Sequence, residues 1–514
     1  MSNKYKRIAR STLILYFRMI CIALVSFYTV RVVLDVIGVE DYGIYNVVVG
    51  IVALSSFIPT ALSSATQRYF SFALGENNLI KLEQIFSTNL IIYMGVTAVA
   101  VLLLETVGFY LVSQHLKIPG DKSGNAMLLY HLAVFAFAFS IFSAPFMAII
   151  ISHEDMNIYA VITVTESVAK LLAVFFLAQL PFDRLVAYGW LMMLVALVVM
   201  LMYMIIAFRK YPECHLRKLT ADKALVKDVL GFTGWTIFGS FTTIIRIHGV
   251  TVLLNQMFNP TVVAARAIAI QVVSFTNIFA QNFNTALYPP IIKSYAENKK
   301  TEMHQLVFDG SKLTFFLMWI LLLPIILKIE FLIDLWLKNA PAETYLFAQL
   351  ALLESLIFAI SMPLTTAARA PGKMRLYELT LGTIQLLILP VSWLVLYLGY
   401  SAYSVFVVAI AANLVMFVVR IIIVEYVAGL SGVAFYRKVV MPVLLVAVLS
   451  GAAASILEPL YGDTFLSVLG FSITTVAVTS IFVYFFGISQ TLKIKLEFYC
   501  ASALRRCVSV CRFK

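Results

Sequence analysis

The run LVAYGWLMMLVALVVMLMYMIIA, from Leu185 to Ala207, decides the fold. Between Arg184 and Arg209 the chain carries no charged residue. At about 1.5 Å per residue, a helix of this length crosses the roughly 30 Å of hydrocarbon in a lipid bilayer. A strand of a membrane barrel would alternate polar and apolar residues, and this run does not. The segment therefore predicts a transmembrane helix.

The whole chain has the same apolar character. Of its 514 residues, 62% are hydrophobic and 12% are charged, and the mean hydropathy is +0.95. Soluble domains are nearer half apolar, so this composition excludes an ordinary soluble protein. The basic segment 1–10 precedes an apolar run that is too long for a signal peptide and has no Ala-x-Ala-like cleavage site. We therefore expect that run to remain as the first span.

Apolar runs between charged or turn-rich breaks predict about 14 transmembrane helices, and hence an all-α polytopic membrane protein. The spans cover approximately residues 11–36, 44–70, 86–113, 127–151, 158–180, 185–207, 230–256, 264–292, 305–328, 343–366, 377–399, 403–426, 438–457 and 465–487. With the N-terminus inside, 26 of the 38 lysines and arginines fall in cytoplasmic segments, 6 in outer loops and 6 within spans. By the positive-inside rule, both termini are expected in the cytoplasm.

The longest internal loop, Arg209 to Lys227, separates two six-helix halves. A faint repeat pairs Val33–Gly38 with Leu253–Phe258 at an offset of 220 residues, and also pairs 75–78 with 295–298. Six spans in each half would give the two lobes the same orientation in the membrane. We expect an N-lobe at 1–208, a cytoplasmic linker at 209–229, a C-lobe at 230–426, two further spans in 427–487 and a basic cytoplasmic tail at 488–514.

The sequence lacks the motifs of soluble catalysis. It has no Gly-x-x-x-x-Gly-Lys-Ser/Thr phosphate loop and no His-Glu-x-x-His zinc motif, so we expect neither a cofactor nor a metal. The five cysteines show no metal spacing and are expected to stay reduced, the tail pair Cys507 and Cys511 included. The net charge of +12 follows from the cytoplasmic bias and needs no nucleic acid. The tail suits either an amphipathic segment on an anionic leaflet or a solvated extension.

Polar residues recur at three- and four-residue steps along the eighth span. This spacing places them on one helical face. Amides that face lipid would be unpaired, so the face is expected to look onto a wet cavity or onto neighbouring helices through hydrogen bonds. The residues are Gln271, Ser274, Asn277, Gln281, Asn284 and Tyr288.

Arg246 lies near the middle of the seventh span, on a face shared with Gly239, Thr242 and Gly249. An arginine inside the bilayer usually faces a cavity or an anionic partner. Its own helix has no acid three or four residues away. Two interpretations stay open: Arg246 binds an anionic substrate, or it pairs with an acid on another helix, such as Glu354.

Arg18 in the first span also lacks a local acid, and it either faces the cavity or extends to the headgroups. Arg31 has Asp35 one turn onward, which favours a structural ion pair near the outer surface. Arg420 shares a face with Asn413 close to the cytoplasmic end of its span, where extension to the headgroups explains it.

Three further charged residues are candidates for ion coupling. Glu166 and Lys170 stand four residues apart in the fifth span, either as a static pair or as a switch whose partners separate during transport. Glu105 lies in the third span without an obvious partner.

Two stretches resemble the start of the polysaccharide flippases of the Wzx type. They are Ile-Gly-Val-Glu-Asp-Tyr-Gly-Ile-Tyr at 37–45 and Ala-Thr-Gln-Arg-Tyr-Phe at 65–70. These O-antigen and capsule flippases belong to the multidrug/oligosaccharidyl-lipid/polysaccharide (MOP) exporter superfamily, with its MATE-like and MurJ-like two-lobe architecture. The resemblance covers the whole chain in span number, repeat and orientation.

The resemblance implies a multi-pass protein of the bacterial inner membrane that acts in surface polysaccharide and lipopolysaccharide biosynthesis. It would move an oligosaccharide linked to undecaprenyl pyrophosphate between leaflets by alternating access, with H⁺ or Na⁺ as a possible counter-ion. Cavity arginines in related lipid flippases correspond here to Arg18, Arg68, Arg246 and Arg266. Together with Ser274, Asn277, Gln281 and Asn284 of the eighth span, they form the expected substrate-binding set.

Two other functions stay open. A cation-coupled multidrug exporter of the MATE type has the same fold, but such relatives use a carboxylate well inside the first helix, whereas Asp35 lies at the outer end here. A membrane-embedded glycan polymerase or ligase usually carries a long external loop, and the outer loops of this chain are short. We therefore expect a transporter rather than an enzyme.

Overall fold

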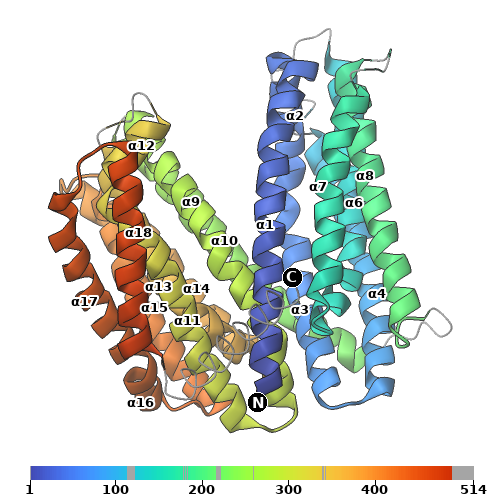
Figure 1. Cartoon of the computed structure of the whole chain (residues 1–514). Coiled ribbons are helices and arrows are strands. Elements are labelled where there is room, and N and C mark those ends of the chain that lie inside the picture. The colour runs from blue at the N-terminus through green and yellow to red at the C-terminus, as the bar shows by residue number, and fades with distance from the viewer. Residues whose placement is uncertain are drawn as a thin grey trace, which may run out of the picture.

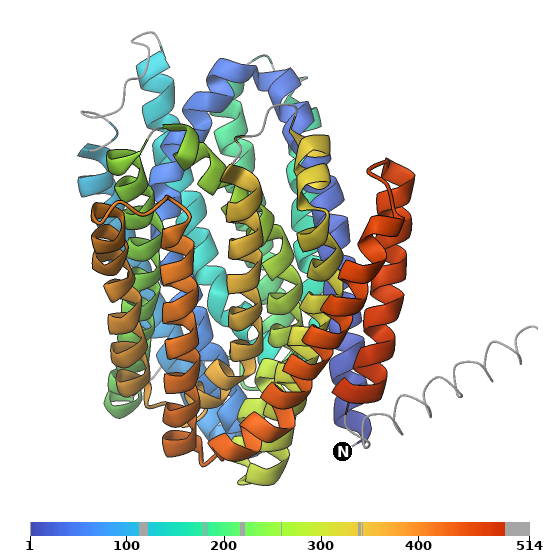
Figure 2. The same ribbon diagram turned by 90° about the vertical axis from the view of Figure 1, so that its left-hand side faces the viewer.

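The computed structural model describes residues 2–110, 112, 122–177, 179, 181, 183–215, 222–258, 260–337, 341 and 343–488. Within these ranges the chain is built from helices and contains no strand. This confirms the all-α class. Two helical lobes stand side by side, with their long helices running roughly along one direction (Figures 1 and 2).

The N-lobe contains the first seven long helices of the chain, two of which, α2 and α3, are the parts of one broken span. They are α1 (Ser2–Ile37), α2 (Val39–Ala53), α3 (Phe57–Gly75), α4 (Leu79–Leu103), α6 (Ser123–Ser152), α7 (Met156–Leu177) and α8 (Arg184–Lys210). Its core includes the fully buried Phe70, Phe86 and Phe146, from three different helices.

The C-lobe repeats this arrangement with α9 (Lys223–Met257), α10 (Pro260–Ala296), α11 (Lys300–Leu327), α12 (Ile329–Trp336), α13 (Glu343–Arg369), α14 (Met374–Tyr397) and α15 (Ser404–Ala428). The short α16 (Gly432–Phe435) leads to two further long helices, α17 (Met441–Leu457) and α18 (Phe465–Phe482). These two stand at the edge of the C-lobe (Figures 1 and 2). They pack on α11, where Trp319 Nε1 donates to Ser450 Oγ over 2.8 Å.

Among the described residues, thirteen helices are long and apolar enough to cross a membrane. The expected span at 44–70 is the one outside this set, and the structure divides it between α2 and α3 by a 3-10 turn at Leu54–Ser56. The turn lies within the five residues that precede Pro59. Proline lacks an N–H and its ring crowds the preceding turn, so a local change of helix type here has a direct cause.

The helix ends follow from the residues that close them. Asn78 caps α4 by accepting from Lys81 N at 3.0 Å, Asp183 caps α8 by accepting from Val186 N at 3.1 Å, and Asp222 caps α9 by accepting from Ala224 N at 2.9 Å. Each short side chain satisfies a backbone donor that the helix leaves free.

The internal repeat is visible in the helix bounds. The unit α2–α3 covers 39–75 and α10 covers 260–296, so both ends are displaced by 221 residues. Each unit ends in a turn with an asparagine in the left-handed region, Asn77 at φ 52° and Asn298 at φ 56°. The sequence-based offset of 220 is therefore one residue short in this segment, because it aligned Gly75 with Tyr295 rather than with Ala296.

The lobes meet at the end of the molecule where α1 begins, here called the N side, and diverge toward the opposite end, the far side (Figure 1). Near the N side, Arg369 Nη1 donates to Ser64 Oγ at 2.8 Å and Lys293 Nζ donates to Glu154 Oε1 at 2.9 Å. Gly75 makes the approach of α3 and α10 possible, since a Cβ there would lie 2.8 Å from the Cβ of Ala296.

Candidate functional site

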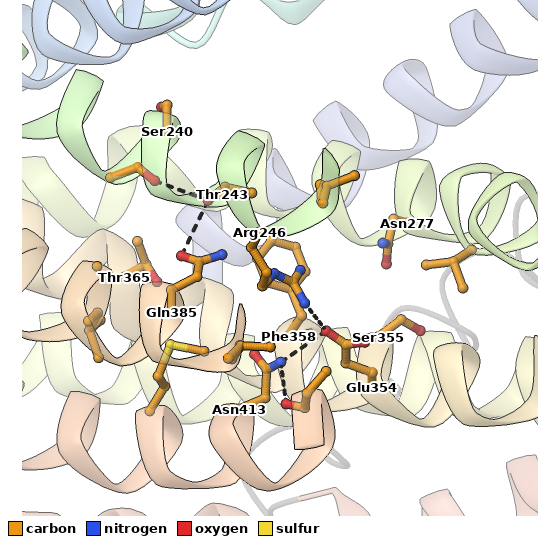
Figure 3. Close-up of a pocket in the computed structure, with 18 of the residues that line it drawn as sticks. Ser240, Thr243, Arg246, Asn277, Glu354, Ser355, Phe358, Thr365, Gln385 and Asn413 are labelled. Atoms are coloured by element: carbon orange, nitrogen blue, oxygen red, sulfur yellow. Dashed lines mark hydrogen bonds and ion pairs between the residues drawn. The ribbon is translucent and has the colours of Figure 1, made fainter. Parts of the chain in front are cut away.

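A cavity of about 530 Å³ opens within the C-lobe between α9, α10, α13, α14 and α15. Figure 3 shows polar side chains from several of these helices that point into it. The charged residues that line it are Arg246, Arg266, Glu354, Arg369, Glu378 and Arg420, and the uncharged polar ones include Thr243, Ser274, Asn277, Gln281, Gln385 and Asn413. A cavity with this lining, inside helices that are otherwise apolar, is the candidate binding site.

Arg246 and Glu354 form an ion pair in this cavity. The Nη1 atom of Arg246 lies 2.8 Å from Oε1 of Glu354, and the two side chains are 21% and 18% exposed. Asn413 Nδ2 donates to the same Oε1 at 2.9 Å and to the carbonyl of Ala409 (Figure 3). The structure thus shows the pairing with Glu354 that the sequence left open as an alternative. The Nε atom of Arg246 is buried and has no hydrogen-bond partner.

The other three cavity arginines donate to neutral acceptors. Arg266 Nη1 donates to Thr251 Oγ1, Arg420 Nε to Tyr377 Oη at 2.8 Å, and Arg369 Nη1 to Ser64 Oγ. In the part of the chain that the structure describes, none of these three has a carboxylate within 4.0 Å. Their positive charge is therefore not neutralised by a direct ion pair.

Glu378 lies in the first turns of α14 and is only 8% exposed. Its carboxylate fills the space left by Gly239 of α9, where a Cβ would lie 2.0 Å from Glu378 Oε2. Gly239 is therefore needed for the carboxylate to stand in this place.

Four arginines against two glutamates give the lining an excess of two positive charges. Charge inside a bilayer is costly unless a partner or water compensates it. Asn277 Oδ1 in the same lining is also buried without a hydrogen-bond partner. The arrangement can therefore receive an anion and offer polar groups to a neighbouring uncharged moiety.

Only part of the polar face predicted for the eighth span lines the cavity. Ser274, Asn277 and Gln281 line the cavity, together with Arg246 and Arg266. Asn284 lies outside this lining and accepts a long hydrogen bond of 3.5 Å from Thr366. Tyr288 donates to the carbonyl of Ser64 in the other lobe at 3.3 Å.

Arg18 and Arg68 lie between the lobes rather than in the cavity lining. Arg18 Nη2 donates to Asn282 Oδ1 of α10 at 3.0 Å, and its guanidinium stands 4.7 Å from the ring centre of Tyr159. Arg68 is buried and donates to the carbonyl of Ala370 at 2.9 Å. It rests against Gly372, which has φ +81° and no room for a side chain.

The ion-coupling candidates are all in the N-lobe. Glu166 and Lys170 form a 2.6 Å pair along α7, with side chains 32% and 46% exposed. Glu105 lies in a π-helical segment, Leu104–Gly108, and its Oε2 is 2.7 Å from Nδ1 of His131 on α6. His131 is the partner that the sequence did not reveal.

Several expectations fall elsewhere. The side chain of Arg31 and the tail with Cys507 and Cys511 lie outside the described residues. In the described ranges, no group of three or more His, Cys, Asp or Glu is placed to hold a metal ion.

Sequence reasoning missed or misplaced four lining residues. The sequence assigns Arg369 to a cytoplasmic loop, but in the structure it is the last residue of α13 and lines the cavity. Arg420 was expected to reach the headgroups, and it donates to Tyr377 inside the lobe instead. Glu378 carried a usable signal, an acid just inside an apolar span, whereas Gln385 carried little.

The fold is that of solved MOP-superfamily transporters. A MATE protein in complex with MaD3S is 12% identical, with a TM-score of 0.72 over 82% of this chain and 97% of that one. An outward-facing multidrug resistance MATE transporter is 14% identical, with a TM-score of 0.71 and coverage of 83% and 96%. A MOP-superfamily transporter from Pyrococcus furiosus, whose description notes a binding pocket of reversed polarity, is 15% identical, with a TM-score of 0.64 and coverage of 84% and 96%.

These likenesses show that the chain has the fold of MOP-superfamily transporters, and its long apolar helices make it a multi-pass membrane protein. A family model described as "Polysaccharide biosynthesis protein" matches residues 8–295, which is more than half of the chain. The chain therefore belongs to the polysaccharide biosynthesis protein family of this superfamily, which confirms the resemblance seen in the sequence. No curated protein shows a significant match to it.

Proposed function

We propose that the protein is a flippase that moves an oligosaccharide linked to undecaprenyl pyrophosphate across the bacterial inner membrane. The observation that carries this proposal is the C-lobe cavity, with four arginines against two glutamates. Arginine is well suited to phosphate groups because its fork of N–H donors can bind two oxygens at once. The family to which the chain belongs supports the glycan part of the substrate.

In this proposal different cavity residues contact different parts of the substrate. Arg246 and Arg266 hold the pyrophosphate, while the polar groups of Ser274, Asn277 and Gln281 face the sugar hydroxyls. Arg18 lies at the contact between the lobes and Asn284 lies beside Thr366 within the C-lobe, and both meet the substrate when the lobes part. Arg68 acts on the closed contact through the carbonyl of Ala370.

In this proposal the N side of the molecule faces the cytoplasm, as the positive-inside rule predicts. The lobes are closed at the N side and diverge at the other (Figure 1), so under this orientation the open side faces the periplasm. Inward opening then requires the breaking of the contacts that Ser64 and Glu154 accept from the C-lobe. Exchange between two such states around one site is alternating access.

A cation-coupled multidrug exporter is the second candidate. Two observations favour it: solved MATE transporters share the fold, and the cavity contains the carboxylates of Glu354 and Glu378. The excess of arginine in the same cavity argues for an anion as the principal substrate, with the carboxylates left for a coupled H⁺ or Na⁺.

Vesicle transport distinguishes the two candidates. The purified protein is reconstituted into lipid vesicles with a fluorescent polyprenyl-pyrophosphate oligosaccharide, and its movement between leaflets is followed by a membrane-impermeant quencher. We expect rapid exchange with the wild type, a loss of about a hundredfold or more with Arg246→Ala, and little change with Arg209→Ala, because Arg209 is exposed at the end of α8 and far from the cavity lining.

A parallel assay with a lipophilic cationic dye tests the rival. Dye export driven by an imposed H⁺ or Na⁺ gradient, with no exchange of the lipid-linked glycan, would overturn the flippase proposal.

A further inference from the structure

The Arg246–Glu354 pair differs from the rest of the cavity. Arg266, Arg369 and Arg420 donate to neutral acceptors, whereas Arg246 is the one of the four cavity arginines with a carboxylate of the described residues at ion-pair distance. The pair is neither deeply buried nor at the surface, and both of its members line the cavity. Any anion that enters the cavity therefore finds Arg246 already engaged.

The contact uses only part of what each partner offers. Glu354 reaches Nη1 of Arg246 with one oxygen, Oε1, while Nε of the same guanidinium has no partner. A carboxylate or phosphate that binds an arginine with two oxygens makes a stronger and more directional contact than a single-oxygen one. Once the guanidinium turns away from Glu354, a phosphate group can engage Nε and an Nη atom together and so outcompete the single-oxygen contact.

Asn413 is a second hydrogen-bond donor to the carboxylate of Glu354. Its Nδ2 donates to Oε1 of Glu354 and also to the Ala409 carbonyl of its own helix, so the amide is fixed in direction. When Arg246 turns to another anion, the carboxylate keeps this neutral donor. Removal of one member of a buried pair usually leaves the other charge uncompensated, and Asn413 lessens that cost.

We propose that Glu354 is a resident counter-ion, which occupies Arg246 in the empty cavity and competes with the substrate phosphate for it. The inference rests on the proposed function and adds to it a residue that limits affinity and so promotes release. Without the Glu354 carboxylate, Nη1 of Arg246 is free for the phosphate, so the site binds the phosphate more tightly and releases it more slowly.

Binding of farnesyl pyrophosphate to the purified, detergent-solubilised protein tests the proposal by titration calorimetry. Glu354→Gln keeps the size of the side chain and removes its charge. We expect this variant to bind farnesyl pyrophosphate about tenfold more tightly than the wild type, near the lower end of the coupling measured for close charge pairs. Glu76→Gln, which removes a carboxylate from an exposed N-lobe pair with Lys81, is the matched control and should bind as the wild type does.

A double-mutant cycle separates competition from a structural effect. In the Arg246→Ala background, Glu354→Gln should no longer tighten binding, because the counter-ion then has no arginine to occupy. Glu354→Ala is a second variant that removes the charge without an amide, and it should shift affinity in the same direction as Glu354→Gln. Thermal unfolding of each variant verifies that it is folded.

The binding results distinguish a failure of the counter-ion proposal from a failure of the flippase proposal. Unchanged or weaker binding by both Glu354 variants, while the wild type binds the probe, overturns the resident counter-ion and leaves the flippase proposal intact. A tightening that persists without Arg246 also overturns it. If the wild type binds no pyrophosphate and instead binds the cationic dye, the proposed function itself fails and the counter-ion fails with it.

Discussion

The two lobes use one architecture for different chemistry. Pro145 in α6 and Pro363 in α13 stand at equivalent places, and nine residues before each proline the N-lobe has Ala136 where the C-lobe has Glu354. Ala136 lines an N-lobe pocket of about 200 Å³ whose other lining residues are almost all apolar. The C-lobe cavity at the corresponding helices is larger and charged. The repeat thus supplies the scaffold of both lobes, and side chains in the C-lobe copy supply the charged binding cavity.

The largest expected effect comes from placing the C-lobe acid in the N-lobe. Ala136→Glu introduces a carboxylate among apolar side chains with no arginine in that pocket. An unpaired charge in such surroundings costs several kcal/mol, so we expect little folded protein and a strongly lowered unfolding temperature in detergent.

Ala136→Gln is the control for this substitution, because it has almost the same size and no charge. It should be clearly less damaging than Ala136→Glu. Equal damage from both would show that volume, and not the apolar nature of the N-lobe pocket, sets the cost.

A second test concerns the ion pairs that join the lobes. Glu154, at φ 63° in the turn between α6 and α7, accepts from Arg7 and from Lys293 of the C-lobe. Glu154→Gln leaves Lys293 without its carboxylate, and we expect the closed N side to lose about 3 kcal/mol. The fraction of closed molecules, measured by spin-label distances between the lobes, should fall accordingly. Glu76→Gln, at an exposed N-lobe pair with Lys81, is the control.

The same contact predicts a pH dependence. Burial alone would raise the pKa of Glu154, but the hydrogen bond from Arg7 and the charge of Lys293 outweigh it and hold the pKa below its ordinary value of 4.5. The carboxylate therefore stabilises the closed contact fully above that ordinary value, and the contribution is lost as the pH falls through the lowered pKa. Closure in Glu154→Gln should not vary across this window; an identical acid response in the variant would assign it to another group.

A third test gives the two copies of the repeat the same residue at the place where α3 contacts α10. Gly75→Ala gives α3 the same residue that α10 has at Ala296, but the new Cβ would lie 2.8 Å from both the Ala296 Cβ and the Lys293 carbonyl. Since backbone cannot move aside cheaply, we expect the closed contact to weaken by about 2 kcal/mol. A cysteine introduced at Thr365, in a background without native cysteines, should then react faster with an impermeant maleimide supplied from the N side.

Gly124→Ala serves as the control, because a Cβ there meets no atom within 4 Å. It should leave the maleimide reaction unchanged. Slow labelling in Gly75→Ala, equal to that of the wild type, would mean that the lobes absorb the new methyl group without parting.

The fold was predictable from the sequence because its signals are local. Long apolar runs and the distribution of lysine and arginine define spans and halves without reference to packing. The expected span 44–70 is the one outside the thirteen candidate membrane helices of the described residues, and a 3-10 turn at Leu54–Ser56 divides it near Pro59. Arg246 and Asn277 were likewise detectable as polar residues in apolar surroundings.

The partners of these residues were less predictable, because they depend on which helices become neighbours. Pairing with Glu354 was one of two interpretations for Arg246, and only the packing of α13 against α15 brings Asn413 to the same oxygen. Arg369 and Arg420 lie near helix ends, where the sequence cannot distinguish an inward turn from an extended side chain. Glu105 gained its partner, His131, from another helix in the same way.

The last test, with the smallest change in stability, asks whether the backbone turns at Asn77 in the N-lobe and Asn298 in the C-lobe are equivalent. Asn77 and Asn298 close equivalent turns in the left-handed region, which an asparagine tolerates better than an alanine. Asn77→Ala and Asn298→Ala should each destabilise the protein by about 1 kcal/mol, and the glycine variants should stabilise it by a few tenths, because glycine has no Cβ to strain. Thermal unfolding in detergent measures all four. If the two alanine variants differ by more than the error, the turns are not equivalent, and the asymmetry of the lobes then extends from their side chains to the backbone itself.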